Sequence, residues 1–360
     1  MSPIAELDQL IPQIRPLNPD WFEKARQRLD QLTKPRGSLG RLEELAAHYV
    51  AIREELFPPL DRKVVCVFAA DHGVVAEGVS AFPSEVTFQM VANFLRGGAA
   101  INVLARHVGA QVQVVDIGVK ADFDPQPGLI SRKVAYGSRN LAVEPAMSQE
   151  EVAQALRVGL ALAQENVAAG VDILAIGEMG IGNTTPAAAL AAVFTAQPAA
   201  AVTGRGTGVD DATFRHKVAV IERALAHHRP DPRDPVGVLA QIGGLEIAGM
   251  TGLILGAAAA RRPVVVDGFI ATAAALVAVR LCPRVKDYML AAHQSVEPGH
   301  QLMLDSLGLK PLLALGMRLG EGTGAVLGMS LVDAGLKIYK EMATFAEAGV
   351  ADRTEGAGPP

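Results

Sequence analysis

The segment Val64-Val65-Cys66-Val67-Phe68-Ala69-Ala70-Asp71-His72-Gly73 decides the fold class of this chain. Its apolar part is short and rich in β-branched residues, which is typical of a strand buried on both faces. Similar runs recur along the chain, separated by longer helical stretches, at residues 112–115, 173–176, 264–266 and 289–292. Apolar strands that alternate with helices predict an α/β fold with a mostly parallel, Rossmann-like sheet flanked by helices.

An ionisable side chain follows each of these apolar runs. The residues are Asp71 with His72, Asp116, Glu178, Asp267 and His293. One such residue has an ordinary explanation, because a strand has to become polar where it reaches the surface. This explanation is weaker for an Asp, Glu or His after every one of the five runs. Ligands of open α/β sheets bind beyond the carboxyl ends of the strands, so the pattern predicts a binding cleft at this edge.

Three glycine-rich segments are candidates for the walls of that cleft: GEMGIGNTTP at 177–186, TGRGTG at 203–208 and GEGTGA at 320–325. Glycine lets the backbone approach a ligand closely, and the N–H groups of such loops bind phosphate, especially where a helix begins. Neither of the first two matches a Walker loop or the dinucleotide fingerprint, and a tight turn with a good helix cap is the alternative for each. Glu321, a lone acid between glycines, indicates a positioned proton acceptor.

The composition limits the class of protein and its partners. The chain has 360 residues, of which 50% are hydrophobic, and a formal net charge of −5. No block of lysine and arginine is long enough to follow a phosphate backbone, so nucleic acid is not expected as a partner. The most apolar segment, residues 247–260, is too short to span a membrane, and the N-terminus lacks a signal-peptide core.

The two cysteines, Cys66 and Cys282, have neither CxxC spacing nor a neighbouring His or Cys cluster. A reducing cytoplasm is therefore the expected location, without a disulfide scaffold or a zinc site. Asp71 and His72 need a third ligand to hold a metal, for which Asp267 and His293 are available, but no metal is expected. The alternative for Asp71 is a loop-organising carboxylate that accepts backbone N–H bonds.

The ends of the chain are helical in character, unlike its middle. We expect a small, discontinuous helical domain of residues 1–60 and 306–348 and a large α/β substrate-binding domain of residues 61–305. The tail, residues 349–360, is polar with glycine and proline and is expected to be flexible.

Six strings along the chain carry a family resemblance: LTKPRGSLG at 32–40, AADHGV at 69–74, GEMGIGNTT at 177–185, GGLEIAGM at 243–250, VDGF at 266–269 and GEGTG at 320–324. In this order they resemble the nicotinate-nucleotide:dimethylbenzimidazole phosphoribosyltransferases, which make α-ribazole phosphate for the lower ligand of cobalamin. The likeness extends from about residue 20 to residue 345. It implies an α/β domain with a small helical domain from both termini, a homodimer, no cofactor, and nicotinate mononucleotide and dimethylbenzimidazole as the substrates.

The resemblance also implies roles for individual residues. The family's general base falls on Glu321 and its second cleft acid on Glu178, while Lys217 and Glu246 match a lysine and an acid that line the site; some members carry Asp at the latter position. The implied benzimidazole pocket is Ser80, Gln89, Met179 and Leu319. The implied phosphate-binding residues are Gly180, Gly182, Asn183 and Thr184, with Gly206 and Gly208 from the second glycine loop.

Other functions stay open at this stage. One is phosphoribosyl transfer of the same type to another base, such as adenine or a phenol. Another is a dinucleotide-dependent oxidoreductase, which the fold permits but the missing fingerprint disfavours. A third is a nucleotide-binding regulator without catalysis, which the pair Glu321 and Glu178 disfavours.

Overall fold

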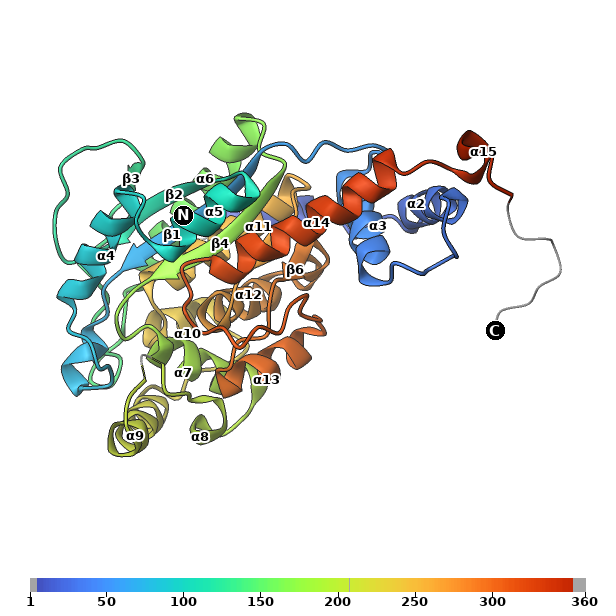
Figure 1. Cartoon of the computed structure of the whole chain (residues 1–360). Helices are drawn as coiled ribbons and strands as arrows, with labels where there is room; N and C mark the ends of the chain where they lie inside the picture. Colours follow the sequence, from blue (N-terminus) through green and yellow to red (C-terminus); the bar gives the residue numbers. More distant parts are fainter. Residues whose placement is uncertain (1–4, 207, 352–360) are drawn as a thin grey trace. The chain divides into compact units, whose positions relative to one another are not determined.

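The computed structural model describes residues 5–206 and 208–351 (Figure 1). It divides the chain into two compact units, one of residues 1–15 and 61–329 and the other of residues 16–60 and 330–360. The larger unit contains the sheet and every residue of the candidate site.

The sheet of the larger unit has six strands in the order β3-β2-β1-β4-β5-β6, and every neighbouring pair is parallel. The strands are β1 Lys63–Ala70, β2 Ala110–Gly118, β3 Leu129–Ser131, β4 Ile173–Met179, β5 Val264–Val266 and β6 Met289–Ala291. The predicted parallel α/β fold is therefore confirmed. Only β3 has no counterpart among the predicted strands, because it is short and lies at the edge, where its residues are not buried.

Helices cover both faces of this sheet. Those of the larger unit are α1 Ala5–Leu10, α4 Glu85–Leu95, α5 Ala100–Val108, α6 Gln149–Ala168, α7 Thr184–Thr195, α8 Ala199–Val202, α9 Asp211–His228, α10 Pro235–Ile242, α11 Leu245–Ala259, α12 Phe269–Leu281 and α13 Pro298–Leu307. Phe68 of β1 packs on Gly249 of α11, whereas Val65 of the same strand faces Gly322, which also lies against Ile101 of α5. Because alternate residues of a strand point to opposite faces, α5 and α11 cover opposite faces.

Helices α6 and α11 approach each other through glycines. A Cβ atom at Gly159 of α6 would overlap the carbonyl oxygen of Gly249 and lie 2.5 Å from the Leu253 nitrogen. Gly252 of α11 lies in the same way against the Leu156 carbonyl. Residues 245–258 of α11 are buried, which explains its apolar sequence as a core helix. Among the described residues, no helix is long and apolar enough to cross a membrane.

The smaller unit contains α2 Pro19–Gln31, α3 Arg41–Arg53 and α15 Phe345–Ala348, and α14 Thr323–Glu341 contributes its later part. The turn before α3 is held by Glu43, which accepts a hydrogen bond from the Leu39 nitrogen at 2.9 Å and pairs with Lys34 at 2.8 Å. This contact gives Lys34 of the LTKPRGSLG string a structural role.

The boundaries of the units differ from the expected ones. Residues 306–329 belong to the larger unit, because the chain after α13 returns to the sheet: the Leu312 and Leu313 nitrogens donate to the Ala291 and Ala292 carbonyls at 3.1 and 3.0 Å. Residues up to Arg15 also belong there, and the Arg15 carbonyl accepts a hydrogen bond from the Tyr288 hydroxyl. The expected flexible tail lies outside the described residues from position 352 onward.

Candidate active site

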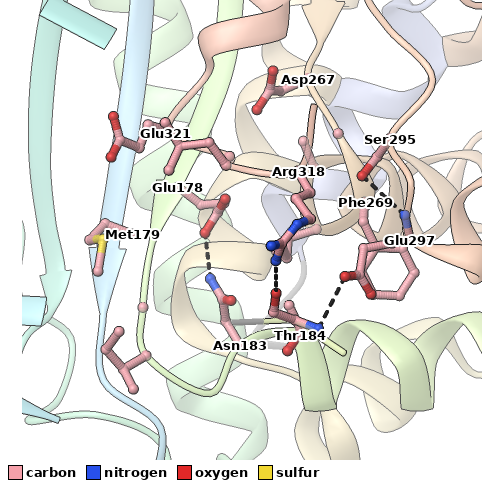
Figure 2. Close-up of a pocket in the computed structure, with 18 of the residues that line it drawn as sticks. Glu178, Met179, Asn183, Thr184, Asp267, Phe269, Ser295, Glu297, Arg318 and Glu321 are labelled. Carbon is pink, nitrogen blue, oxygen red and sulfur yellow. Dashed lines mark hydrogen bonds between the residues drawn. The ribbon is translucent and has the colours of Figure 1, made fainter. Parts of the chain in front are cut away.

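A cavity of about 630 Å³ opens at the carboxyl ends of β4, β5 and β6, at the predicted edge of the sheet. Its walls come from α4 and the loop before it, the loop from β4 to α7, the start of α12 and the segments 293–297 and 318–321. Four carboxylates line it: Glu178, Asp267, Glu297 and Glu321. Figure 2 shows these four side chains around the same space as Thr184 and Arg318.

Glu321 sits in a left-handed turn, with a φ of 63° between Gly320 at 84° and Gly322 at 88°. A non-glycine residue in this region is uncommon and is held there by surrounding contacts. Gly177 supplies one such contact, because a Cβ atom there would lie 2.5 Å from the Gly322 nitrogen. The Glu321 side chain is only 6% exposed, and its exposed surface faces the cavity.

The carboxylate of Glu321 accepts a hydrogen bond from the Ile101 nitrogen in the first turn of α5, at 3.3 Å. Burial raises the pKa of Glu321 above its ordinary value, the Ile101 hydrogen bond opposes this rise, and the charge of Asp267 adds to it. A carboxylate with a raised pKa is a stronger base while it stays ionised. The arrangement can therefore orient a proton acceptor toward a ligand in the cavity.

Asp267 holds the Glu321 turn in place. Its carboxylate accepts hydrogen bonds from the Gly322 and Ala325 nitrogens at 3.1 and 2.9 Å, where α14 begins. His293 lies against it, with Nε2 3.7 Å from the Asp267 carboxylate. An acid at a helix N-terminus satisfies backbone donors that have no partner within the helix.

Glu178 is the last residue but one of β4 and lies next to Gly320, so the second acid is in the same cavity as Glu321. Its carboxylate accepts a hydrogen bond from the Asn183 side-chain amide (Figure 2). Burial raises the pKa of Glu178 to about 8; the Asn183 hydrogen bond opposes this, and the charges of Asp267, Glu246 and Glu321 add to it. Glu178 is therefore mostly neutral at pH 7 while the cavity holds no ligand.

The loop from β4 to α7 uses some of its backbone donors within the protein. The Ile181 nitrogen donates to the Thr87 hydroxyl at 3.1 Å, and the Asn183 and Thr185 nitrogens donate to the Gly180 and Gly182 carbonyls. Behind the loop, the fully buried Lys217 donates to the Thr184 hydroxyl at 2.6 Å. Burial lowers the pKa of Lys217 to about 8, and the charge of Glu297 opposes this.

Comparison with known proteins identifies the family. A family model described as Phosphoribosyltransferase matches residues 14–350. The nicotinate-nucleotide–dimethylbenzimidazole phosphoribosyltransferase of Geotalea uraniireducens is 59% identical over 346 residues, which are 96% of this chain and 98% of that protein. This chain belongs to the nicotinate-nucleotide–dimethylbenzimidazole phosphoribosyltransferase family.

Other proteins are similar to this chain over nearly its whole length. A protein of the same name from Chloroflexus aggregans is 60% identical over 349 residues, covering 97% of this chain and 99% of that one. The crystal structure of CobT from Thermus thermophilus has a TM-score of 0.89 at 50% identity, with 92% of this chain and 99% of that chain covered.

Eight of the residues that the family resemblance implied line the cavity: Glu321, Glu178, Met179, Leu319, Gly180, Asn183, Thr184 and Gly206. Lys217 lies behind Thr184, to whose hydroxyl it donates a hydrogen bond. Gly182 has a φ of 88° and packs on Val75, and Gly208 borders a neighbouring cavity of about 500 Å³. Gln89 is exposed on α4, and the Ser80 hydroxyl accepts a hydrogen bond from the Phe82 nitrogen.

Glu246 does not line the cavity, in contrast to the expectation. It is fully buried, and its carboxylate lies 2.8 Å from Nε2 of His72. Burial alone lowers the pKa of His72, but the charge and hydrogen bond of Glu246 and the charge of Asp71 raise it above the ordinary value. The His72 ring packs beneath Gly180, so this pair supports the loop from below. Asp71 accepts a hydrogen bond from the Lys120 nitrogen at 2.8 Å, the loop-organising role given above as its alternative.

Sequence reasoning missed several residues that line the cavity. They are Phe82, Val86, Met90, Phe269, Ser295, Glu297 and Arg318. The apolar ones carry no sequence signal that separates them from core residues, and Arg318 lies just before the glycine-rich segment 320–325. In the described part of the chain, no group of three or more His, Cys, Asp or Glu side chains could hold a metal ion.

The raised pKa of Glu178 predicts a pH-dependent change in stability. Between the ordinary pKa of 4.5 and the folded-state value of about 8, the folded protein holds a proton that the unfolded chain releases, so stability falls as pH rises. The variant Glu178→Gln removes this loss. Urea unfolding should show the free-energy difference between variant and wild type shifting in favour of the variant by about 2–4 kcal/mol from pH 5 to pH 8. A difference that does not change with pH would contradict the assignment.

Proposed function

We propose that this protein transfers the 5-phosphoribosyl group of nicotinate mononucleotide to 5,6-dimethylbenzimidazole, giving α-ribazole 5′-phosphate and nicotinate. The proposal rests on one observation above all: Glu321 presents a buried carboxylate to a cavity that combines apolar walls with the glycine-rich start of α7. The names of the relatives agree with these substrates. The product is a nucleotide of cobalamin biosynthesis.

Glu321 is the general base of the proposed reaction. As one ring nitrogen of dimethylbenzimidazole attacks the anomeric carbon of the ribose, the carboxylate takes the proton from the other ring nitrogen. The bond from ribose to nicotinate breaks, and the electron pair returns to the pyridine ring. Because this leaving group is already a pyridinium, it departs without being protonated. Attack from the face opposite nicotinate inverts the anomeric centre to the α configuration.

Glu178 stabilises the transition state once the nucleotide is bound. The positive pyridinium ring lowers the pKa of a nearby carboxyl group, so nucleotide binding is expected to ionise Glu178. Its charge then stabilises the oxocarbenium character that develops on the ribose as nicotinate leaves. Burial and the charges of Asp267 and Glu321 raise the pKa of Glu178 in the free protein, and Asn183 holds its carboxylate in place.

The nucleotide phosphate is proposed to bind at the start of α7, on the backbone of residues 180–184, with Gly206 nearby. Lys217 contributes its charge from behind Thr184. The aromatic base occupies the apolar part of the cavity between Met179, Leu319 and the α4 side chains Val86 and Met90. These side chains offer no hydrogen bonds, so a purine such as adenine would leave its polar edge unsatisfied there. The chemistry of this wall favours a benzimidazole over adenine.

The protein is further proposed to act as a homodimer in the cytoplasm, as expected from the family resemblance. It uses neither a cofactor nor a dinucleotide, since both reacting groups come from the two substrates. The oxidoreductase alternative has no support from the family comparison, which concerns phosphoribosyltransferases alone.

The direct test is to mix the protein with nicotinate mononucleotide and a panel of bases that includes dimethylbenzimidazole, benzimidazole, adenine and a phenol. Chromatography should show free nicotinate and a new nucleotide, with dimethylbenzimidazole as the best acceptor. If no base releases nicotinate, the proposed function is wrong.

The raised pKa of Glu321 predicts the acid side of the pH profile. The base works only when ionised, so kcat/KM should fall as pH is lowered through a pKa that lies above the ordinary 4.5. Steady-state rates measured from about pH 5 to pH 8 check this expectation. The variant Glu321→Gln, assayed at high enzyme concentration, should lack this acid limb; an unchanged limb would assign it to another group.

A further inference from the structure

Arg318 has a place in the cavity that the proposed mechanism does not use. Among the described residues that line the cavity, it is the only lysine or arginine. Its guanidinium donates a hydrogen bond to the Gly206 carbonyl at 3.0 Å, and within the described part of the chain it pairs with no carboxylate. Figure 2 shows the side chain extending toward the end of the cavity where Thr184 lies.

The negative charges of the cavity and of the nucleotide favour a cation at this position. Nicotinate mononucleotide carries a phosphate and a carboxylate, and it has to enter a space that is also lined by the carboxylates of Asp267, Glu297 and Glu321. Like charges that lie close together in a partly buried site repel strongly. Arginine suits the role of counter-charge, because its planar fork of N–H donors matches phosphate geometry and it stays charged.

The position of Gly206 indicates which anionic group of the nucleotide Arg318 binds. A Cβ atom at Gly206 would lie 2.8 Å from the Thr184 hydroxyl and 3.2 Å from Nζ of Lys217. Arg318 is therefore anchored beside the start of α7 and the buried lysine, where the phosphate is proposed to bind. The Gly206 nitrogen itself donates a hydrogen bond to the Glu297 carboxylate at 3.1 Å. This glycine loop therefore has one N–H group fewer to offer a phosphate than its sequence suggested.

We propose that Arg318 binds the 5′-phosphate of the nucleotide, opposite the start of α7. This inference rests on the proposed function and adds a specificity-determining residue to it. Arg318 begins the short segment that also contributes Leu319 to the base pocket and Glu321 to catalysis. Phosphate binding by Arg318 thus fixes the segment that carries the general base.

The experiment compares Arg318→Gln with wild type, using two competitive inhibitors that separate the anions of the nucleotide. Inorganic phosphate represents the phosphate, and free nicotinate represents the carboxylate. In the variant, the KM for nicotinate mononucleotide and the inhibition constant of phosphate should each rise about 10–100-fold, the usual effect of losing a charge-assisted hydrogen bond. The inhibition constant of nicotinate should stay the same.

Arg215→Gln is the matched control. Arg215 is exposed on α9 and is not among the described residues that line the cavity. This control should leave the KM and both inhibition constants at their wild-type values. Arg318→Lys keeps the charge without the fork and should give an intermediate KM.

Two results overturn the inference. An unchanged KM and phosphate inhibition constant in Arg318→Gln would show that the arginine does not bind the phosphate. A rise confined to the nicotinate inhibition constant would assign it to the carboxylate instead. If wild type releases no nicotinate, the proposed function itself has failed, and calorimetric binding of inorganic phosphate to wild type, Arg318→Gln and Arg215→Gln still tests Arg318 in the same way.

Discussion

The variant Glu321→Gln is expected to lower turnover by about 10²–10⁴-fold, the usual contribution of a positioned general base. The amide oxygen of glutamine can still accept the Ile101 hydrogen bond, so the side chain keeps its place at the start of α5. It cannot take the proton from the benzimidazole ring. The loss should therefore appear in kcat, while calorimetry should give a nicotinate mononucleotide affinity close to that of wild type.

The control for this variant is Glu341→Gln, the same change at an exposed position near the end of α14. It should retain wild-type kinetics, and both variants should unfold at wild-type temperatures within a few degrees. Near-normal turnover of Glu321→Gln would remove Glu321 from the mechanism. A collapse of both turnover and melting temperature would indicate a structural role for the acid in its left-handed turn.

Replacing Gly159 with valine is expected to destabilise the larger unit by about 3 kcal/mol or more. The new Cβ would overlap the Gly249 carbonyl oxygen and lie 2.5 Å from the Leu253 nitrogen. These obstacles are backbone atoms of α11, which cannot rotate away as a side chain can. Because α11 packs on β1 through Gly249, the two helices cannot separate without disturbing the sheet.

The matched control is Gln154→Val, which adds a valine to the exposed side of the same helix. Urea unfolding should show only a small loss for this variant, on the order of 0.5 kcal/mol, from the lower helix propensity of valine. Equal destabilisation by the two substitutions would show that helix propensity, not the close approach of α6 and α11, determines the cost at Gly159.

The larger features of this protein could be predicted from local sequence. Five of the six strands are short apolar runs, and parallel strands covered on both faces require this composition wherever they occur. Helix starts are equally local: Ser148 and Glu151, three residues apart, form a capping box at the start of α6. The acids Glu178 and Glu321 each stand beside glycines, and the family resemblance implied that they share one cleft; both line the cavity.

The boundaries of the two units and the membership of the site depend on long-range contacts. The sequence cannot show that the chain after α13 hydrogen-bonds to β6, since this pairing joins segments through backbone atoms that carry no residue signature. For the same reason, residues 306–329 were expected in the smaller unit. Whether Gln89 or its neighbours Val86 and Met90 line the cavity depends on which face of α4 points toward it.

By itself, the sequence determined the parallel sheet, the edge where the cavity lies and two of the acids that line it. These are properties of short segments whose residue types restrict their own backbone. Only the tertiary structure decided what each charged side chain does. Glu246 pairs with His72 beneath the cavity, Asp267 holds the Glu321 turn, and Arg318 faces the carboxylates. The physical reason is that the charge state and direction of a side chain depend on burial and on partners that folding brings from distant parts of the chain.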